Sequence, residues 1–175
     1  GEKVTISSPN HAAKLNIGMV HQHFKLVSDY TITENIILGV EPIRKFAGLF
    51  PYVDIRNANR KIEELSKSFG LEVDPTKKIA DLNVSMQQRV EILKVLYREA
   101  DILIFDEPTA VLTPQEIQEL LVIMKHLAAE GKSILFITHK LAEIMQVADR
   151  CSVLRKGKYI GTVDIKDSTP ESLSA

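Results

Sequence analysis

The chain has 175 residues, of which 45% are hydrophobic and 26% are charged, and its formal net charge is −1. These values fit one globular domain with a sizeable core and exclude an intrinsically disordered chain. The balanced charge gives no indication of a surface for nucleic acid or an anionic membrane. The apolar runs are too short to span a bilayer, and the single cysteine excludes an internal disulfide framework.

The two ends of the sequence carry no domain boundary signal. The first residue is Gly1 rather than Met, and no signal-peptide pattern follows it. The last residues, 168–175, have no feature that marks the end of a domain. We therefore expect the chain to be a segment of a longer protein.

The sequence of the first half of the chain predicts short strands and two helices. Residues 3–6 and 17–20 each predict a strand, and residues 33–39 predict a short helix capped by Thr33. The next stretch contains Pro42, Gly48 and Pro51 and predicts a loop.

An amphipathic helix is expected over residues 54–69, with Asp54 as its cap and Gly70 at its end. No strand is evident between residues 33 and 80. We interpret that segment as a helical insertion.

The second half alternates helices with compact apolar strands. The strongest helix start is Thr113-Pro114 followed by Glu116, a capping residue with proline at the first position and glutamate three residues on. This helix is expected to run to about residue 130. The other predicted elements are helices at 86–99 and 140–147, strands at 101–105 and 134–138, and a hairpin of 151–155 with 159–163.

This alternation predicts an α/β fold with a mainly parallel sheet and helices on both faces. We divide the chain into a core, residues 1–32 and 81–175, and a helical subdomain, residues 33–80.

Two neighbouring buried strands end in groups that suit phosphate chemistry. Asp106 and Glu107 follow the apolar run 102–105, and His139 follows the next apolar run. Ligands of open α/β sheets lie at the carboxyl ends of the strands, where one acid can hold Mg²⁺ and the other can face a water. The alternative is that the two acids are merely solvated and that the histidine only caps the end of its strand. The occurrence of both patterns after neighbouring strands disfavours this alternative.

Four motifs in this order resemble those of the ATP-binding cassette (ABC) transporter family. They are the segment 18–24 around Gln22, the segment 82–89, Asp106-Glu107-Pro108-Thr109, and Thr138-His139. The resemblance covers essentially the whole chain and implies a P-loop NTPase-like fold with ATP and Mg²⁺ as ligands.

The resemblance assigns a role to each residue of the site. It implies that Asp106 and Gln22 serve Mg²⁺, that Glu107 orients or deprotonates the attacking water, and that His139 contacts the γ-phosphate. Gln22 would also link the site to a transmembrane partner. Residues Ala110, Val111 and Leu112 would form the loop between two cassettes.

The family's signature sequence is altered in this chain. Leu-Ser-x-Gly-[Gln/Met] reads Leu82-Asn83-Val84-Ser85-Met86 here. The resemblance implies that Asn83, Ser85, Met86 and Gln88 meet the nucleotide of the opposite cassette, but side chains in place of glycine crowd that approach. Ser85 and Gln88 also form an S-x-x-Q pattern, which predicts a capping box that would occupy the helix N–H groups. Two interpretations are open: a weakened site, or a pair of cassettes that tolerates one weak site.

The phosphate-binding loop of the family, G-x-x-x-x-G-K-[ST], does not occur in these residues. Gly131-Lys132-Ser133 leads from helix into strand, the reverse of the required order. We therefore expect the N-terminal strands and this loop to be missing from the chain. We expect the 175-residue polypeptide alone to bind ATP negligibly and to be inactive.

Three segments have sequences that resemble those of the importers of simple sugars and nucleosides, in particular the first of their two cassettes: HQHF, QQRVEILKVLYR and DEPTAVLTPQE. The resemblance implies an ATPase on the cytoplasmic face of the membrane. Its partners would be permease subunits, a second cassette and, indirectly, a solute-binding protein, with no nucleic acid.

Phe46, Leu49, Phe50 and Tyr52 could supply the docking surface for the permease, or could instead close over the chain's own core. The alternative functions are a soluble cassette ATPase of DNA repair or translation and a non-catalytic cassette that acts as an interaction module.

Overall fold

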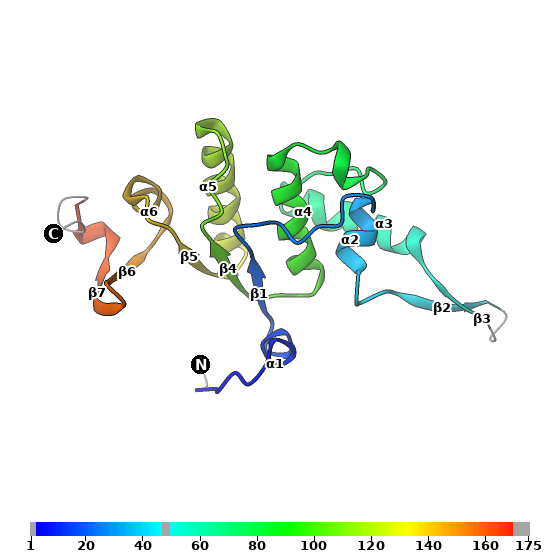
Figure 1. Ribbon diagram of the computed structural model, residues 1–175, viewed down its shortest axis with the longest axis horizontal. Coiled ribbons are helices and arrows are strands. Elements are labelled where there is room, and N and C mark those ends of the chain that lie inside the picture. The colour runs from blue at the N-terminus through cyan, green and yellow to red at the C-terminus, as the bar shows by residue number, and fades with distance from the viewer. Residues whose placement is uncertain (1–2, 47–49, 170–175) are drawn as a thin grey trace.

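The computed structural model describes residues 3–46 and 50–169. Its centre is a small parallel sheet with helices beside it, and a two-stranded hairpin projects at each end of the long axis (Figure 1). The predicted α/β fold with a mainly parallel sheet is confirmed.

The sheet consists of β1 (Ile17–Val20), β4 (Ile102–Asp106) and β5 (Ser133–Ile137), in the order β1-β4-β5. Both pairings are parallel, and Val20 lies opposite Phe105, which lies opposite Phe136. Parallel neighbours end at the same edge, so the residues after β4 and β5 meet there. The three strands match their predictions closely.

One face of the sheet is covered by α4 (Val84–Tyr97) and α5 (Pro114–Ala129). Leu103 and Phe105 point toward this face and are fully buried. On this face β1 packs very closely against α4 at Gly18. A Cβ built on Gly18 would lie only 2.9 Å from the Cβ of Val95 on α4, so the absence of a side chain permits this approach. The opposite face exposes apolar side chains, among them Ile102, Leu135 and Ile137.

Helix α5 begins as predicted. The Thr113 side chain accepts a hydrogen bond from the backbone N–H of Glu116, and the Glu116 side chain accepts one from the backbone N–H of Thr113. Gly131 follows the helix with φ 87°, a backbone conformation that glycine adopts without strain.

The insertion contains α2 (Ile32–Ile37), α3 (Ile55–Ser68) and the 3₁₀ turn η1 (Ile79–Asp81). Asp54 caps α3 as predicted. The cap of α2 is Thr31 rather than Thr33, because only Thr31 has glutamate three residues later; together with Glu34 it forms a reciprocal capping box.

The expectation of a loop holds at Pro42 and is wrong at Pro51, which lies in a strand, while Gly48 lies outside the described residues. Residues on either side of the undescribed segment 47–49 form an antiparallel hairpin, β2 (Ile43–Phe46) and β3 (Phe50–Val53). Pro51 is tolerated because β2 and β3 are both edge strands, since no other strand of the described residues pairs with them. The insertion is therefore not purely helical.

The chain termini differ in how well the sequence predicted them. Residues 3–6 do not form the expected strand, since none of the strands among residues 3–46 and 50–169 pairs with them; α1 (Pro9–Lys14) follows instead. Near the other end, α6 (Leu141–Val147), β6 (Arg150–Arg155), β7 (Lys158–Asp164) and η2 (Ile165–Asp167) follow one another. The β6–β7 turn has positive φ at Lys156 and Gly157, as the predicted hairpin requires.

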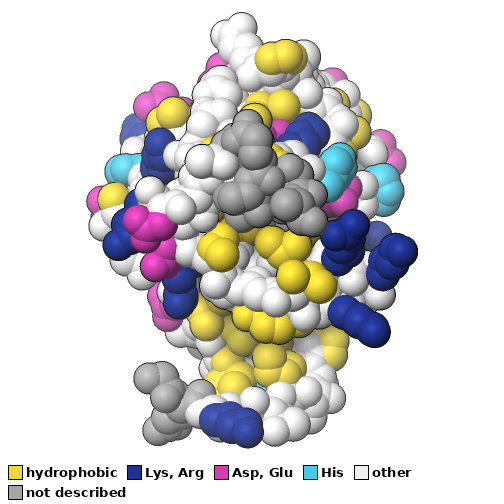
Figure 2. Space-filling model, turned by 90° about the vertical axis from the view of Figure 1, so that its left-hand side faces the viewer, with side chains coloured by type: hydrophobic (Ala, Val, Ile, Leu, Met, Phe, Trp, Pro, Cys, Tyr) yellow, Lys and Arg dark blue, Asp and Glu magenta, His cyan; other side chains and the backbone are white. Residues whose placement is uncertain are grey.

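One cluster of buried side chains runs through the core and the insertion. It includes Ile36 and Ile62 of the insertion together with Phe105 and Leu127 of the core. Apolar side chains also remain on the surface near the C-terminal hairpin, at the end of the molecule seen in Figure 2, where Leu154, Tyr159 and Ile160 are exposed. Within residues 3–46 and 50–169, no helix has the length and apolarity that a membrane span needs.

Candidate functional site

Three predicted site residues meet at the carboxyl edge of the sheet. Glu107 Oε1 lies 3.4 Å from His139 Nδ1, and Glu107 Oε2 accepts a hydrogen bond from Gln22 Nε2 at 3.4 Å. The contacts are long for hydrogen bonds, and His139 and Gln22 are open to solvent. The three side chains follow β4, β5 and β1, respectively, so the parallel sheet itself brings them together.

The backbone around Glu107 has an unusual conformation. Its φ is 43°, in the left-handed region that non-glycine residues avoid. The backbone N–H of Glu107 donates to the carbonyl of Ile137 on β5, which extends the pairing of Asp106 with Ile137 by one residue. The left-handed step then turns the chain out of the sheet and directs the Glu107 carboxylate toward His139 and Gln22.

The residues expected to serve a metal fit a hydrated Mg²⁺ ion rather than a cage of protein ligands. Within the described residues, no group of three or more His, Cys, Asp or Glu side chains could hold a metal ion on its own. Mg²⁺, however, keeps several waters and needs one or two protein oxygens plus phosphate. The half-buried Asp106 carboxylate at the end of β4, with the Gln22 amide on the neighbouring segment, fits that requirement.

The signature segment begins helix α4, and the structure corrects the predicted cap. The N-cap is Asn83, whose side chain accepts a hydrogen bond from the backbone N–H of Met86 at 2.9 Å. Ser85 is the second helical residue and is not the cap. Gln88 is only 3% exposed, and its amide donates to the carbonyl of Pro108 at 2.7 Å. The predicted Ser85–Gln88 capping box is therefore wrong, and Gln88 faces the protein interior rather than a nucleotide.

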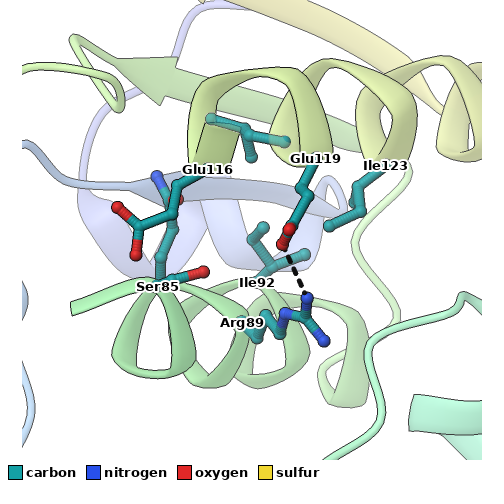
Figure 3. A pocket seen from close by; sticks show the side chains of 8 residues that line it. Ser85, Arg89, Ile92, Glu116, Glu119 and Ile123 are labelled. Carbon is teal, nitrogen blue, oxygen red and sulfur yellow. Dashed lines mark hydrogen bonds and ion pairs between the residues drawn. The ribbon is translucent and has the colours of Figure 1, made fainter. Parts of the chain in front are cut away.

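A groove of about 320 Å³ lies between the first turns of α4 and α5. Asn83, Ser85 and Met86 line one side of it, and Thr113, Gln115 and Glu116 line the other. In a smaller hollow beside it, the Arg89 guanidinium reaches across to the Glu119 carboxylate, with Nη2 and Oε2 3.1 Å apart (Figure 3). Three of the four predicted signature residues thus border one groove, and an ion pair joins the two helices that form it.

The loop predicted to lie between two cassettes follows Thr109. Ala110 and Val111 are exposed, whereas Leu112 packs partly against the core. The backbone N–H of Ala110 donates to the carbonyl of Glu107 at 3.2 Å, so the loop starts as a tight turn at the acidic residue.

A buried polar cluster next to the site was not predicted from the sequence. Thr109 Oγ1 donates to Glu143 Oε2 at 2.9 Å, and Lys140 Nζ donates to the Thr109 carbonyl at 3.1 Å. Thr109 and Glu143 are 2% and 4% exposed, respectively. The signal was present in the sequence, because Lys140 and Glu143 lie three residues apart directly after His139.

A second missed contact ties the segment after Gln22 to α4. The backbone N–H of Lys25 donates to the carboxylate of Glu91 at 2.6 Å, and Lys94 Nζ donates to the Lys25 carbonyl at 3.0 Å. Glu91 is 2% exposed. The helix that begins after Asn83 therefore also holds the segment that carries Gln22.

Sequence comparison connects these features to known proteins. The family model described as "ABC transporter" matches residues 1–110. The nucleoside import ATP-binding protein NupA of Lactococcus lactis is 59% identical over 99% of this chain, and the guanosine import ATP-binding protein NupO of Bacillus subtilis is 57% identical over all of it. The chain spans about a third of the length of these relatives, 33% in both cases.

Solved structures share the fold. CbiO1 from Clostridium perfringens, part of the ABC transporter complex CbiONQ, superposes with a TM-score of 0.72 at 24% identity, covering 91% of this chain and 62% of CbiO1. An ATP-binding cassette solved as a dimer in a post-hydrolysis state with ADP and Pi superposes with a TM-score of 0.69 at 21% identity, covering 91% of this chain and 68% of that cassette. The family match over residues 1–110 and the 59% identity to NupA establish that the chain belongs to the ABC transporter family.

Proposed function

We propose that this chain is the catalytic part of a cassette that hydrolyses ATP to power the import of nucleosides or simple sugars. The observation that carries the proposal is the convergence of Gln22, Glu107 and His139 within 3.4 Å contacts at the carboxyl edge of the sheet. The names of the relatives support the solute class, since they include importers of nucleosides, guanosine and ribose. The activity belongs to the complete protein that carries this sequence.

Each residue has a distinct task in this proposal. The Glu107 carboxylate accepts a hydrogen bond from the attacking water and holds it in line with the phosphate. His139 donates a hydrogen bond to a γ-phosphate oxygen, where negative charge develops. The carboxylate of Asp106 and the amide oxygen of Gln22 would hold Mg²⁺ through its waters. When bound, the metal neutralises phosphate charge and orients the transferring group.

The groove between α4 and α5 is proposed to face a second cassette. The first backbone N–H groups of a helix have no intrahelical partner and attract anions. The Asn83 side chain accepts a hydrogen bond from the Met86 N–H, so this donor is no longer available to an anion. The N–H groups of Val84 and Ser85 lie before it, in the first two positions of the helix. We infer that the nucleotide of the partner cassette meets this end of α4 more weakly than it would meet a glycine-containing signature.

The β2–β3 hairpin is proposed to dock on the permease. Phe50 and Tyr52 are 68% and 46% exposed, so these two side chains do not close over the chain's own core. Leu49 and the side chain of Phe46 lie outside the described residues. The hairpin projects at one end of the molecule (Figure 1), which suits contact with a large partner. The chain would then act as a peripheral subunit on the cytoplasmic face of the membrane, with a solute-binding protein serving the permease on the other side.

Uptake measurements test the proposal directly. Cells that lack the gene would be complemented with the complete protein or with its Glu107→Gln variant, and uptake of labelled guanosine and ribose would be measured. We expect the wild type to restore uptake of one of these solutes and the variant to restore neither. The proposal would be contradicted if the Glu107→Gln variant restored uptake, or if loss of the gene changed the uptake of neither guanosine nor ribose.

A further inference from the structure

The turn that carries Glu107 is held in a conformation it would not adopt by itself. Glu107 has a φ of 43°, and a non-glycine residue stays in this region only where its surroundings over-determine it. Its own side chain offers little restraint, since its contacts to Gln22 and His139 are both long. Restraint comes from the backbone hydrogen bonds that Glu107 makes with Ile137 and Ala110, and from the residues that follow, Pro108 and Thr109, both of which are buried.

One anchor of this turn comes from α4. The Gln88 amide donates to the Pro108 carbonyl at 2.7 Å, and Gln88 is 3% exposed. Bulk water has little access to a bond so well enclosed, and loss of the donor would leave a buried carbonyl without that partner. The Pro108 ring has no N–H of its own, so this residue is held through its carbonyl.

The other anchor comes from α6, which begins directly after Lys140. Glu143 accepts hydrogen bonds from Thr109 Oγ1 at 2.9 Å and from Thr138 Oγ1 at 3.3 Å. Lys140 Nζ lies 3.3 Å from Glu143 Oε1 and also donates to the Thr109 carbonyl. The side chain of Glu143 thus joins Thr109, two residues after Glu107, to Thr138, the residue before His139.

The turn from Glu107 to Thr109 is therefore clamped between α4 and α6. From this arrangement we propose that Gln88 is a positioning residue that couples the signature helix α4 to the orientation of the Glu107 carboxylate. A movement of the first turns of α4, where Asn83 and Ser85 border the groove, is transmitted through Gln88 to Pro108 and from there to Glu107. The proposal rests on the proposed ATPase function and assigns to Gln88 a task other than contact with the nucleotide.

Gln88→Met tests the hydrogen bond with the least change of shape, because methionine has similar length and no amide donor. In the complete protein, kcat for ATP hydrolysis should fall on the order of ten- to a hundredfold, the size expected when a reacting group is displaced by about 1 Å. KM for Mg-ATP should stay within about twofold, because Gln88 does not touch the nucleotide. Gln146→Met is the matched control: it removes a glutamine amide bond to a backbone carbonyl, that of Ala142 at 3.0 Å, on an exposed part of α6.

A double-mutant cycle separates positioning from general damage to the fold. If Gln88 acts through Glu107, Gln88→Met should not lower the residual single-turnover rate further in the Glu107→Gln background. An unchanged kcat in Gln88→Met, or an equal fall in both backgrounds, would overturn the proposal. If the methionine variant does not fold, Gln88→Glu, which keeps the shape and replaces the donor with a carboxylate, must show the same pattern.

The same cycle distinguishes failure of the inference from failure of the function. A complete protein that hydrolyses no ATP, or whose turnover survives Glu107→Gln, contradicts the proposed function. A protein that loses turnover on Glu107→Gln and keeps it on Gln88→Met contradicts only the role of Gln88.

Discussion

The carboxylate of Glu107 and the imidazole of His139 lie 3.4 Å apart although 32 positions separate them in the sequence. The contact follows from the parallel pairing of β4 with β5, in which Asp106 lies opposite Ile137. Each side chain extends just beyond its strand, so both reach the same space at the edge of the sheet. The contact between them requires no movement of either element.

This relationship predicts the effect of removing the imidazole. In the complete protein, His139→Ala should lower kcat for ATP hydrolysis on the order of a hundredfold, because a donor to the developing phosphate charge is lost. Binding of Mg-ATP, measured by calorimetry, should change far less. His11→Ala serves as control, since that imidazole lies on α1 beside the Ser7 hydroxyl, and its removal should leave turnover unchanged. Equal turnover in His139→Ala and wild type would exclude the assigned role.

The cap of α4 predicts a stability difference between two substitutions. Asn83→Ala removes the acceptor for the Met86 N–H and should lower the free energy of unfolding by about 1 kcal/mol. Asn83→Ser keeps a capping oxygen and should stay within a few tenths of a kcal/mol of the wild type. Denaturant titrations measure both. If the two variants were equally stable, Asn83 would not be the cap.

The close approach of β1 to α4 predicts a cost for a single added methyl group. In Gly18→Ala the new Cβ would lie 2.9 Å from the Val95 Cβ and 3.0 Å from the Ala100 Cβ, neither of which can rotate away. Overpacking of this kind should lower the free energy of unfolding, measured by denaturant titration, by about 1–3 kcal/mol. Gly161→Ala on β7 is the matched control, because a Cβ added at that glycine would meet nothing within 4 Å. That control should be neutral or slightly stabilising, and equal stability of the two variants would contradict the close packing of β1 on α4.

Asp101, at the start of the sheet, predicts a pH-dependent contribution to stability. Hydrogen bonds from Lys132 and from Asn16 lower the pKa of its carboxyl below the usual 3.8. A lowered pKa in the folded state means that the contribution is complete above pH 3.8 and is lost as the pH falls below that value. Asp101→Asn should therefore be less stable than wild type at neutral pH, and the difference should shrink in acid. A difference that grew on acidification would contradict the assigned contacts.

Much of the fold could be predicted from local patterns. The apolar runs before Asp106 and His139 predicted two strands, and Thr113 with Glu116 predicted a helix start that the structure matches closely. These predictions succeed because the burial of a strand and the capping of a helix each depend on residues that lie within a few positions of one another in the sequence. The family resemblance then added the order of the motifs, which no local pattern contains.

The failures have tertiary causes. Ser85 and Gln88 have the spacing of a capping box, yet Gln88 instead bonds to Pro108, twenty residues away, and Asn83 takes the cap. Pro51 suggested a loop, because proline usually weakens a strand, yet it lies in β3. The β2–β3 hairpin pairs only with itself among the described residues, so Pro51 interrupts no further ladder. The i,i+3 spacing of Lys140 and Glu143 is visible in the sequence, but the bond from Thr109 to Glu143 is not, because it joins elements 34 residues apart.

The steady-state rate of Mg-ATP hydrolysis by the complete protein, with and without Glu107→Gln, tests the central claim most directly. Glutamine has the same shape but cannot accept a proton from water, so turnover should fall at least about a hundredfold while Mg-ATP still binds. A variant that hydrolyses ATP at the wild-type rate would show that the carboxylate beside His139 does not activate the attacking water.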